Sequence, residues 1–206
     1  AEGPKLAVVD VNRDGLEDFF VGGASGQAGQ IFLQTKDNQF VASKIEAMTL
    51  SHRLNNPFEK DKICEDVAAV FFDADGDGRL DILLINSRDW RPRGRRSLSP
   101  LYRNNGRGGF TDITAGSGLD RKAKDLLSVC AAFFDYDKDG LLDLVVSHYT
   151  FWSPQVDRRC PTPDGEIYCY PGLYKSVPHS LYRNLGNGKF EDVSEKSGFS
   201  RWAGKG

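Results

Sequence analysis

The sequence predicts an all-β fold made of three four-stranded antiparallel blades of a β-propeller. Three observations lead to this prediction: an acidic nine-residue loop recurs three times, short apolar runs flank each copy, and an aromatic hairpin pattern follows each copy. The composition, 39% hydrophobic and 27% charged, is ordinary for a folded domain. No apolar run in the 206 residues approaches the ~20 residues that a membrane-spanning helix needs.

The acidic loop carries oxygen-bearing side chains at positions 1, 3, 5 and 9 and a glycine at position 6. Its three copies span residues 10–18, 73–81 and 135–143. A polar turn is the alternative interpretation of any single copy, but three copies in register favour calcium binding. The sequence therefore predicts about three Ca²⁺ ions, one per repeat. The predicted side-chain ligands are Asp10, Asn12, Asp14, Asp18, Asp73, Asp75, Asp77, Asp81, Asp135, Asp137, Asp139 and Asp143.

The residues around the loops predict strands rather than the helices of an EF-hand. An EF-hand needs glutamate at position 12, where this chain has Val21, Leu84 and Val146. Apolar, β-branched and aromatic residues flank each loop, as is typical of strands. Each loop therefore connects two strands of a hairpin. The strands before the loops are expected at 6–9, 67–72 and 129–134, and those after them at 18–21, 82–86 and 142–147.

The loops recur at a nearly constant period, which indicates a repeat array. Their first aspartates are 63 and 62 residues apart, and each repeat also carries two aromatic residues spaced by eight. In the second and third repeats glycines between these aromatics indicate a hairpin turn, which adds two strands to each repeat. Four antiparallel strands make a propeller blade. We expect a single array over 1–206, with blades at about 5–46, 66–115 and 128–195.

All length variation between the repeats falls in the same connections. The spacing between loop position 9 and the first of the two aromatic residues is 14, 21 and 39 residues in the three repeats. In an up-and-down blade these variable connections emerge opposite the acidic loops. A protein or glycan ligand is therefore expected on the face opposite the calcium loops, because recognition is usually built on variable connections.

Three blades do not close a propeller ring. An open array exposes strand edges, which natural proteins normally cover. The sequence leaves two explanations open. The chain is either part of a larger propeller or a unit that closes by self-association, for example as a homo-oligomer of two chains with six blades.

The four cysteines fall into two pairs. Cys160 and Cys169 lie in a proline- and tyrosine-rich segment without periodicity, where a short disulfide would fix the chain, so we predict that they are bonded. Cys64 and Cys130 each precede a strand. A disulfide between neighbouring repeats and two buried free thiols are equally compatible with that position.

Other polar and aromatic clusters are open to two interpretations. The arginines of the 88–96 segment favour either a polyanion-binding patch or a solvated loop, and nucleic-acid binding is disfavoured because no reading helix accompanies them. The aromatic residues of segment 149–179 favour either a partner surface or a small core of that segment. His52, His148 and His179 have no catalytic spacing and are interpreted as structural or exposed.

The combined motif resembles the FG-GAP/VCBS repeats of integrin-α-type propellers. The acidic loop is followed by Leu-Tyr-Arg-Asn (101–104 and 181–184) and by a Phe-x-Asp-[Ile/Val]-[Thr/Ser] stretch (110–114 and 190–194). Within these families, the combined motif is most similar to that of the relatives that carry ASPIC/UnbV domains and of cartilage acidic proteins. The first repeat departs from this wording at 31–34. The resemblance implies a secreted or cell-surface protein, and it implies that the backbone carbonyls of Leu16, Arg79 and Leu141 are further calcium ligands.

These features predict a recognition module without catalysis. We expect a calcium-stabilised binding or cell-adhesion domain that is extracellular, on the cell surface or periplasmic, although this chain begins without a signal segment. The alternative is an accessory or catalytic domain of a carbohydrate-active propeller enzyme, which would need titratable groups that converge on the variable face.

Overall fold

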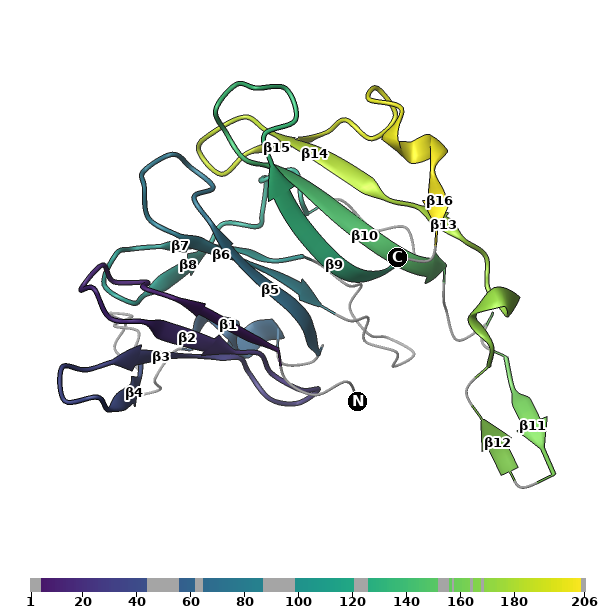
Figure 1. Ribbon diagram of the computed structural model, residues 1–206, viewed down its shortest axis with the longest axis horizontal. Coiled ribbons are helices and arrows are strands. Elements are labelled where there is room, and N and C mark those ends of the chain that lie inside the picture. The colour runs from purple at the N-terminus through teal and green to yellow at the C-terminus, as the bar shows by residue number, and fades with distance from the viewer. Residues whose placement is uncertain are drawn as a thin grey trace.

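The chain folds into three four-stranded antiparallel sheets that lie one after another (Figure 1). The computed structural model describes residues 5–43, 56–61, 65–86, 99–120, 126–151, 156, 158–163, 165–167 and 169–204. Across these residues the predicted all-β class and the four-stranded repeat are confirmed. In this part of the chain no helix is long and apolar enough to span a bilayer.

Each sheet is an up-and-down meander of neighbouring strands. The first sheet has the order β1-β2-β3-β4, formed by β1 (Leu6–Val9), β2 (Asp18–Val21), β3 (Gln30–Gln34) and β4 (Phe40–Ala42). The second has the order β5-β6-β7-β8, formed by β5 (Asp66–Phe72), β6 (Asp81–Asn86), β7 (Leu101–Asn104) and β8 (Phe110–Asp112). The third has the order β9-β10-β14-β15, formed by β9 (Leu126–Phe134), β10 (Asp143–Phe151), β14 (Ser180–Asn184) and β15 (Phe190–Asp192).

Smaller elements fill the connections. A two-stranded hairpin lies between β10 and β14 and projects away from the sheets (Figure 1). We call it the hairpin arm; it is formed by β11 (Cys160–Thr162) and β12 (Gly165–Ile167). The remaining elements are β13 (Val177–Pro178), paired with β16 (Ala203–Gly204), and the 3₁₀ helices η1 (Pro57–Asp61), η2 (Pro171–Leu173) and η3 (Phe199–Arg201).

The acidic loops gather at one end of the sheets. The β1–β2, β5–β6 and β9–β10 connections lie on the same side, and the hairpin arm lies on the opposite side (Figure 1). The strand order therefore separates a constant end, made by short loops, from an elaborated end. This is the separation that the constant and variable spacings predict.

Two apolar cores hold the sheets together. One lies between the first and second sheets, and it includes Phe58 of η1, whose ring centroid is 5.2 Å from that of Phe20 and 4.8 Å from that of Tyr102. The other lies between the second and third sheets, where Phe72 and Phe133 stack at 3.8 Å. Every residue of β6 is buried because β6 is covered on both faces, which explains its unbroken apolar run Ile82–Ile85.

The third blade differs from the prediction in its strand lengths. β9 begins at Leu126 and β10 ends at Phe151, so both are longer than the expected strands at 129–134 and 142–147. The pairing continues through a register shift after Ser147, beyond which His148 and Thr150 are buried. Sequence patterning ended the predicted strand of β10 at Ser147 because polar residues follow there, and it missed Leu126 and Leu127 at the start of β9. The arginines of segment 88–96 and His52 lie outside the described residues.

Candidate metal centres

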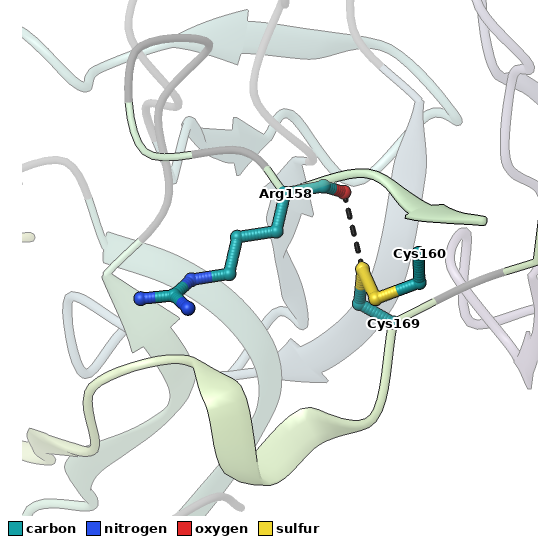
Figure 2. Close-up of a disulfide and its surroundings, with 3 residues drawn as sticks. All are labelled: Arg158, Cys160 and Cys169. Carbon is teal, nitrogen blue, oxygen red and sulfur yellow. Dashed lines mark hydrogen bonds between the residues drawn. A yellow bond between two sulfur atoms is a disulfide. The ribbon is translucent and has the colours of Figure 1, made fainter.

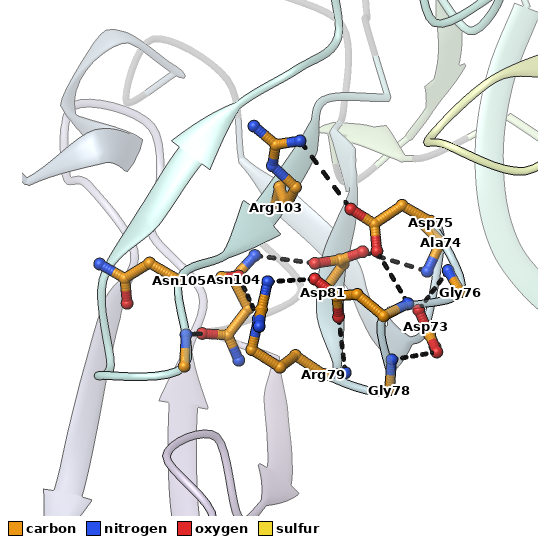
Figure 3. Close-up of polar contacts among 12 residues, drawn as sticks. Asp73, Ala74, Asp75, Gly76, Gly78, Arg79, Asp81, Arg103, Asn104 and Asn105 are labelled. Carbon is orange, nitrogen blue, oxygen red and sulfur yellow. Dashed lines mark hydrogen bonds and ion pairs between the residues drawn. The ribbon is translucent and has the colours of Figure 1, made fainter.

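The first aspartate of each acidic loop organises the turn. Asp73 accepts hydrogen bonds from the backbone N–H groups of Gly76 (2.8 Å) and Gly78 (2.7 Å) (Figure 3). Asp10 accepts the corresponding bonds from Arg13 and Gly15, and Asp135 accepts bonds from Asp139 and Gly140 of its own loop. Such side-chain to backbone bonds let aspartate close a tight turn locally. Position 1 therefore has a structural role in addition to the predicted ligand role.

Two left-handed residues bend every loop in the same way. The glycine at position 6 has φ values of +87° (Gly15), +80° (Gly78) and +89° (Gly140). Position 4 is also left-handed, although only the second loop has glycine there; Arg13 and Lys138 adopt φ of +61° and +64°. Non-glycine residues rarely adopt this conformation. The three loops thus share one backbone shape. From the sequence, a sharp turn was expected only at the glycine of position 6, and the left-handed conformation at position 4 was missed.

The aspartate at position 9 joins the loop to the third strand of its blade. Asp81 is fully buried, and its carboxylate accepts hydrogen bonds from Ala74 N (3.0 Å) and from Asn104 N (2.7 Å), the last residue of β7. Asp18 and Asp143 are equally buried and make the same two kinds of bond. The sequence predicts only the ligand role of these aspartates, because their second partner lies 16 to 41 residues away.

Acidic triads that could hold a metal ion form in the second and third loops. Each residue of a triad offers one oxygen, and within each triad these oxygens lie within 4.8 Å of one another. Asp137 Oδ1 is buried and accepts no hydrogen bond within the described structure. Clustered carboxylate oxygens suit hard cations such as Ca²⁺. The triads are Asp73, Asp75 and Asp81 in the second loop and Asp135, Asp137 and Asp143 in the third.

The first loop has the same fold but a different ligand set. Asn12 replaces the aspartate of position 3, and its side-chain Nδ2 donates a hydrogen bond to Asp14 Oδ2 at 3.1 Å. Among the described residues, no acidic triad forms in this loop. Its amide and carboxylate oxygens could still coordinate a cation, but with one charge fewer than in the other loops.

Arginines contact acidic side chains of the second and third loops, including the position 5 aspartates Asp77 and Asp139, which lie outside the triads. Arg183 Nη2 lies 3.0 Å from Asp139 Oδ2, and its Nε lies 2.6 Å from Asp137 Oδ2. A backbone hydrogen bond from Leu141 and the Arg183 guanidinium lower the pKa of Asp139. In the second loop, Arg79 pairs with Asp77. The ligand role of these two aspartates stays a prediction.

The position 7 residues have a defined backbone contact. The N–H groups of Leu16, Arg79 and Leu141 each donate to the Oδ1 atom of their position 5 aspartate, at 2.8 to 2.9 Å. This bond holds the peptide group that precedes the predicted carbonyl ligand. Coordination by those carbonyls stays a prediction.

Burial disfavours the ionised form of two position 9 carboxylates, those of Asp18 and Asp81. Desolvation raises the pKa of Asp81 to about 6 and also raises the pKa of Asp18, although backbone hydrogen bonds partly oppose both shifts. The neighbouring loop carboxylates raise both values further. A divalent cation in the loop would reverse this penalty, because opposite charge favours the ionised carboxylate.

Asn104 connects two neighbouring loops. Its side-chain Nδ2 donates to Leu80 O (2.9 Å) in its own loop and to Val11 O (2.8 Å) in the loop of the first blade. Its Oδ1 accepts a hydrogen bond from Gly106 N. Asn184 repeats the bonds within its own blade. This role was missed from sequence, although the asparagine recurs in both Leu-Tyr-Arg-Asn segments.

The cysteines at the base of the hairpin arm form a disulfide. Cys160 and Cys169 are bonded, as predicted, and Cys169 Sγ lies 3.1 Å from the carbonyl oxygen of Arg158 (Figure 2). Cys130 is a free, exposed thiol on β9, so the second disulfide that the sequence left open is not formed, and the alternative of a buried thiol is also wrong. Cys64 lies outside the described residues.

Two histidines that are distant in sequence meet at the elaborated end. The ring nitrogens of His148 lie 3.0 Å from Ser128 Oγ and 2.9 Å from Ser180 Oγ, and its backbone N–H donates to His179 Nδ1. Burial, with a smaller effect of His179, lowers the pKa of His148 to about 4. His148 is therefore a neutral, buried structural residue, in agreement with the sequence interpretation.

A comparison with protein families matches these repeats. A model of the FG-GAP-like repeat fits the chain twice, over residues 10–84 and 73–146. The chain belongs to the FG-GAP-like repeat family. Each FG-GAP-like match begins at position 1 of an acidic loop and ends in the strand that follows the next loop. The loop is thus the shared unit of the FG-GAP-like repeats in this chain.

Comparisons beyond the family give a distant structural relative. No curated protein sequence matches the chain. The solved structure of an Agrocybe aegerita lectin, described as recognising non-reducing terminal N-acetylglucosamine, is similar with a TM-score of 0.46 and 17% identity. The similarity covers 97% of this FG-GAP-like chain and 42% of the lectin, so the chain spans less than half of the lectin's length.

Proposed function

We propose that the protein is a calcium-stabilised recognition module without catalytic activity, and that it binds about three Ca²⁺ ions, one in each acidic loop. The observation that carries this proposal is the repeated geometry of the loops. In each loop a buried carboxylate at position 9 lies among further acidic side chains, and the third strand holds it in place. Membership of the FG-GAP-like repeat family supports the same reading.

Calcium would neutralise the clustered carboxylates of the loops. The side chains that would hold it are those of positions 1, 3 and 9, with the position 5 carboxylate and the position 7 carbonyl as further ligands. Because Asp81 also bonds Asn104 on β7, a bound ion would stabilise the sheet as well as the loop. The first loop is proposed to bind most weakly, because Asn12 is neutral.

The ligand-binding surface is proposed to lie at the elaborated end, opposite the loops. Large exposed side chains gather in and near the hairpin arm there: Ile167 is 60% exposed and Tyr170 is 75% exposed. Exposed aromatic residues on a disulfide-closed hairpin suit recognition of a protein or a glycan. The exposure of Tyr170 supports the partner-surface reading of segment 149–179 over that of an internal core.

The absence of catalysis and the cellular location are proposals as well. The paired histidines support a binding role, because both ring nitrogens of His148 are occupied by serine hydroxyls. The Cys160–Cys169 disulfide supports an extracellular, cell-surface or periplasmic location. The Leu-Tyr-Arg-Asn wording supports placing the chain near the ASPIC/UnbV and cartilage acidic proteins within its family.

Calorimetric melting with calcium and with excess chelator tests the metal proposal. Calcium at about 100 times its dissociation constant stabilises a folded state by about 2.7 kcal/mol for each site it fills, which corresponds to about 5–10 °C per site for a domain of this size. The double variant Asp73→Ala/Asp135→Ala should lose most of this shift. The matched control Asp37→Ala, which alters an exposed aspartate in the β3–β4 turn, should keep it. Equal melting temperatures with calcium and with chelator would contradict the proposal.

A binding screen and a turnover screen separate recognition from catalysis. Glycans and extracellular proteins are tested for binding to the wild-type chain and to the Tyr170→Ala variant, and polysaccharides are tested for hydrolysis. Binding that Tyr170→Ala weakens, without turnover, supports the proposal. Hydrolysis of a polysaccharide would favour the carbohydrate-active alternative instead.

A further inference from the structure

The side chain of Asn104 lies between the acidic loops of the first and second blades, and both of its polar atoms are bonded there. Asn104 is only 1% exposed. Its Nδ2 donates to Val11 O at 2.8 Å in the first loop and to Leu80 O at 2.9 Å in the second, and its Oδ1 accepts a bond from Gly106 N. Val11 stands at position 2 of its loop and is itself 2% exposed. One buried amide therefore holds the backbone of two loops that belong to different blades.

The same asparagine is one step from a predicted calcium ligand in each of these loops. Its backbone N–H donates to Asp81 Oδ1 at 2.7 Å (Figure 3). In the first loop, Val11 N donates to Asp18 Oδ2 at 3.0 Å, while the carbonyl of the same valine accepts the bond from Asn104. Asp18 and Asp81 are both fully buried. A buried path from Asp18 through Val11 and Asn104 to Asp81 therefore joins the position 9 carboxylates of the two loops.

A second contact joins the same two loops near their position 1 aspartates. Arg13 Nη2 lies 2.9 Å from a Cβ built on Gly78, so the side chain from the first loop lies against the glycine at position 6 of the second. Arg13 N donates to Asp10, and Gly78 N donates to Asp73. The two loops thus meet beside the first as well as the last of their predicted side-chain ligands.

The junction between the second and third loops is built differently. Ala74 takes the place of Val11 in the second loop, and its carbonyl accepts a bond from Gly188 N at 3.1 Å in the turn between β14 and β15. The side chain of Asn184, the counterpart of Asn104, bonds within its own blade. Gly188 lies four residues beyond Asn184. This contact therefore bypasses the residue that holds the position 9 carboxylate of the third loop.

The arginine contact also has no equivalent at this second junction. Position 4 of the second loop is Gly76, which has no side chain to reach the third loop. Apart from its chain neighbours, no described residue comes within 4 Å of a Cβ built on Gly140, the counterpart of Gly78. The first and second loops are thus the pair that the structure joins, and the third loop serves as the comparison.

We propose that the first and second loops bind calcium cooperatively, with Asn104 as the positioning residue that couples them; this inference rests on the calcium binding proposed above. An ion that orders one loop fixes its position 9 carboxylate. Loosening of the other loop would then leave buried polar groups unbonded, which is unfavourable. The second ion therefore binds a loop that is already ordered, so less conformational entropy is lost. The third loop binds its ion independently.

A calcium titration followed by NMR of the ¹⁵N-labelled chain reads the three sites separately. The position 6 glycines Gly15, Gly78 and Gly140 each donate their amide to the position 1 aspartate of their own loop, so each amide resonance reports the occupancy of one loop. Asp10→Asn weakens the first site and Asp73→Asn weakens the second. Both substitutions leave Asn104 and the position 9 carboxylates in place.

The two site variants should each weaken the neighbouring site. In Asp10→Asn, the calcium concentration that half-saturates the Gly78 signal should rise at least about fivefold, the lower end of typical coupling between sites. Asp73→Asn should raise the half-saturation of Gly15 by a similar factor, because coupling between binding sites is reciprocal. The Gly140 signal should keep its half-saturation in both variants. Unchanged half-saturation of Gly78 and Gly15 would overturn the coupling and leave the proposed calcium binding standing.

Removal of the Asn104 side chain tests the connection itself. In Asn104→Ala both coupling factors should fall to about one, as a double-mutant cycle measures. The matched control Asn184→Ala removes the same side chain from the third blade and should leave both factors unchanged. Should the alanine variant not fold, Asn104→Asp serves instead, because it keeps the acceptor for Gly106 N and lacks both Nδ2 donors.

The remaining outcomes separate this inference from its alternatives. Coupling factors that persist without the Asn104 amide would overturn its role. A response of Gly140 as large as that of Gly78 would also overturn it, and would assign the effect to a general loss of stability. The absence of any calcium-dependent change at the three glycines would overturn this inference together with the calcium proposal on which it rests.

Discussion

Asp81 Oδ1 accepts a 2.7 Å hydrogen bond from the backbone N–H of Asn104, and this bond ties the acidic loop of the second blade to the end of β7. The other carboxylate oxygen of Asp81 accepts a bond from Ala74 N inside the loop. One buried side chain therefore fixes both the loop and the neighbouring strand. The same pair of bonds recurs at Asp18 and Asp143.

Asp81→Asn should weaken the second blade and its metal site together. The amide can accept only one of the two backbone hydrogen bonds, and the lost bond to a buried group corresponds to about 1–3 kcal/mol of unfolding free energy in chelator. The loss should be larger in calcium, because one ligand charge is also removed. Urea unfolding in both conditions, with Asp37→Asn as the exposed control, measures the difference. Equal losses with and without calcium would contradict a ligand role for Asp81.

Arg183→Ala should destabilise the calcium-free protein more than the calcium-loaded one. Without metal, the Arg183 guanidinium is the cation beside Asp137 and Asp139, and a bound ion takes over part of that neutralisation. The melting shift on adding calcium should therefore grow in this variant. Arg103→Ala is the matched comparison, since Arg103 lies 3.9 Å from Asp75 and should have a smaller effect. A shift that shrinks in Arg183→Ala would show instead that the arginine positions the ligands.

His148 should make the protein sensitive to mild acid. Its folded-state pKa is about 4, below the ordinary 6.5, so the unfolded chain binds the proton more readily. Stability from this residue is present above pH 6.5 and is lost as the pH falls toward 4, by about 2–3 kcal/mol. The His148→Gln variant keeps a polar side chain that does not titrate.

The difference between wild type and His148→Gln isolates this effect. The raised pKa of Asp81 has the opposite sign, because folding then favours proton uptake as the pH falls below about 6. This contribution is common to both proteins and cancels in the difference. Urea unfolding in chelator from pH 7.5 to pH 4 gives the two curves. Parallel curves would disprove that His148 is buried in its neutral form.

Loss of the Cys160–Cys169 disulfide should loosen the hairpin arm and leave the blades intact. The bond closes a sequence separation of nine residues, and β11 and β12 pair with each other rather than with a blade. Cys160→Ser/Cys169→Ser should therefore speed amide exchange in 158–170 while the melting temperature of the sheets changes little. Hydrogen exchange read by mass spectrometry resolves the two regions. A large fall in the global melting temperature would mean that the arm supports the third blade.

Much of the fold could be predicted because its determinants are local. The loop aspartates, the glycine of position 6 and the apolar runs beside them lie within about twenty residues of one another, so a single stretch specifies each hairpin. The spacing of eight between aromatic residues fixed the outer pair of strands in the same way. These local signals recur three times, which made the four-stranded repeat predictable, whereas the short strands β11, β12, β13 and β16 between and after the blade strands were not predicted.

The relationships that sequence reasoning missed are long-range. Asn104 bonds a loop 93 residues away, and His148 meets Ser180 and His179 across an excursion of about thirty residues. From the sequence, Arg183 is predicted only to lie in a strand, and its contact with Asp137 depends on the fold. The ends of β9 and β10 were also misplaced, because burial of His148 and Thr150 depends on that packing.

The Cys160–Cys169 disulfide closes the hairpin arm on itself, so the arm could be replaced by another hairpin. β10 and β14 keep their register through Leu144 and Tyr182, near the acidic loop, and that pairing does not involve the arm. A different disulfide-closed hairpin grafted in place of 158–170 should thus be displayed on an unchanged scaffold. Specificity could be rewritten there by library selection without re-engineering the sheets.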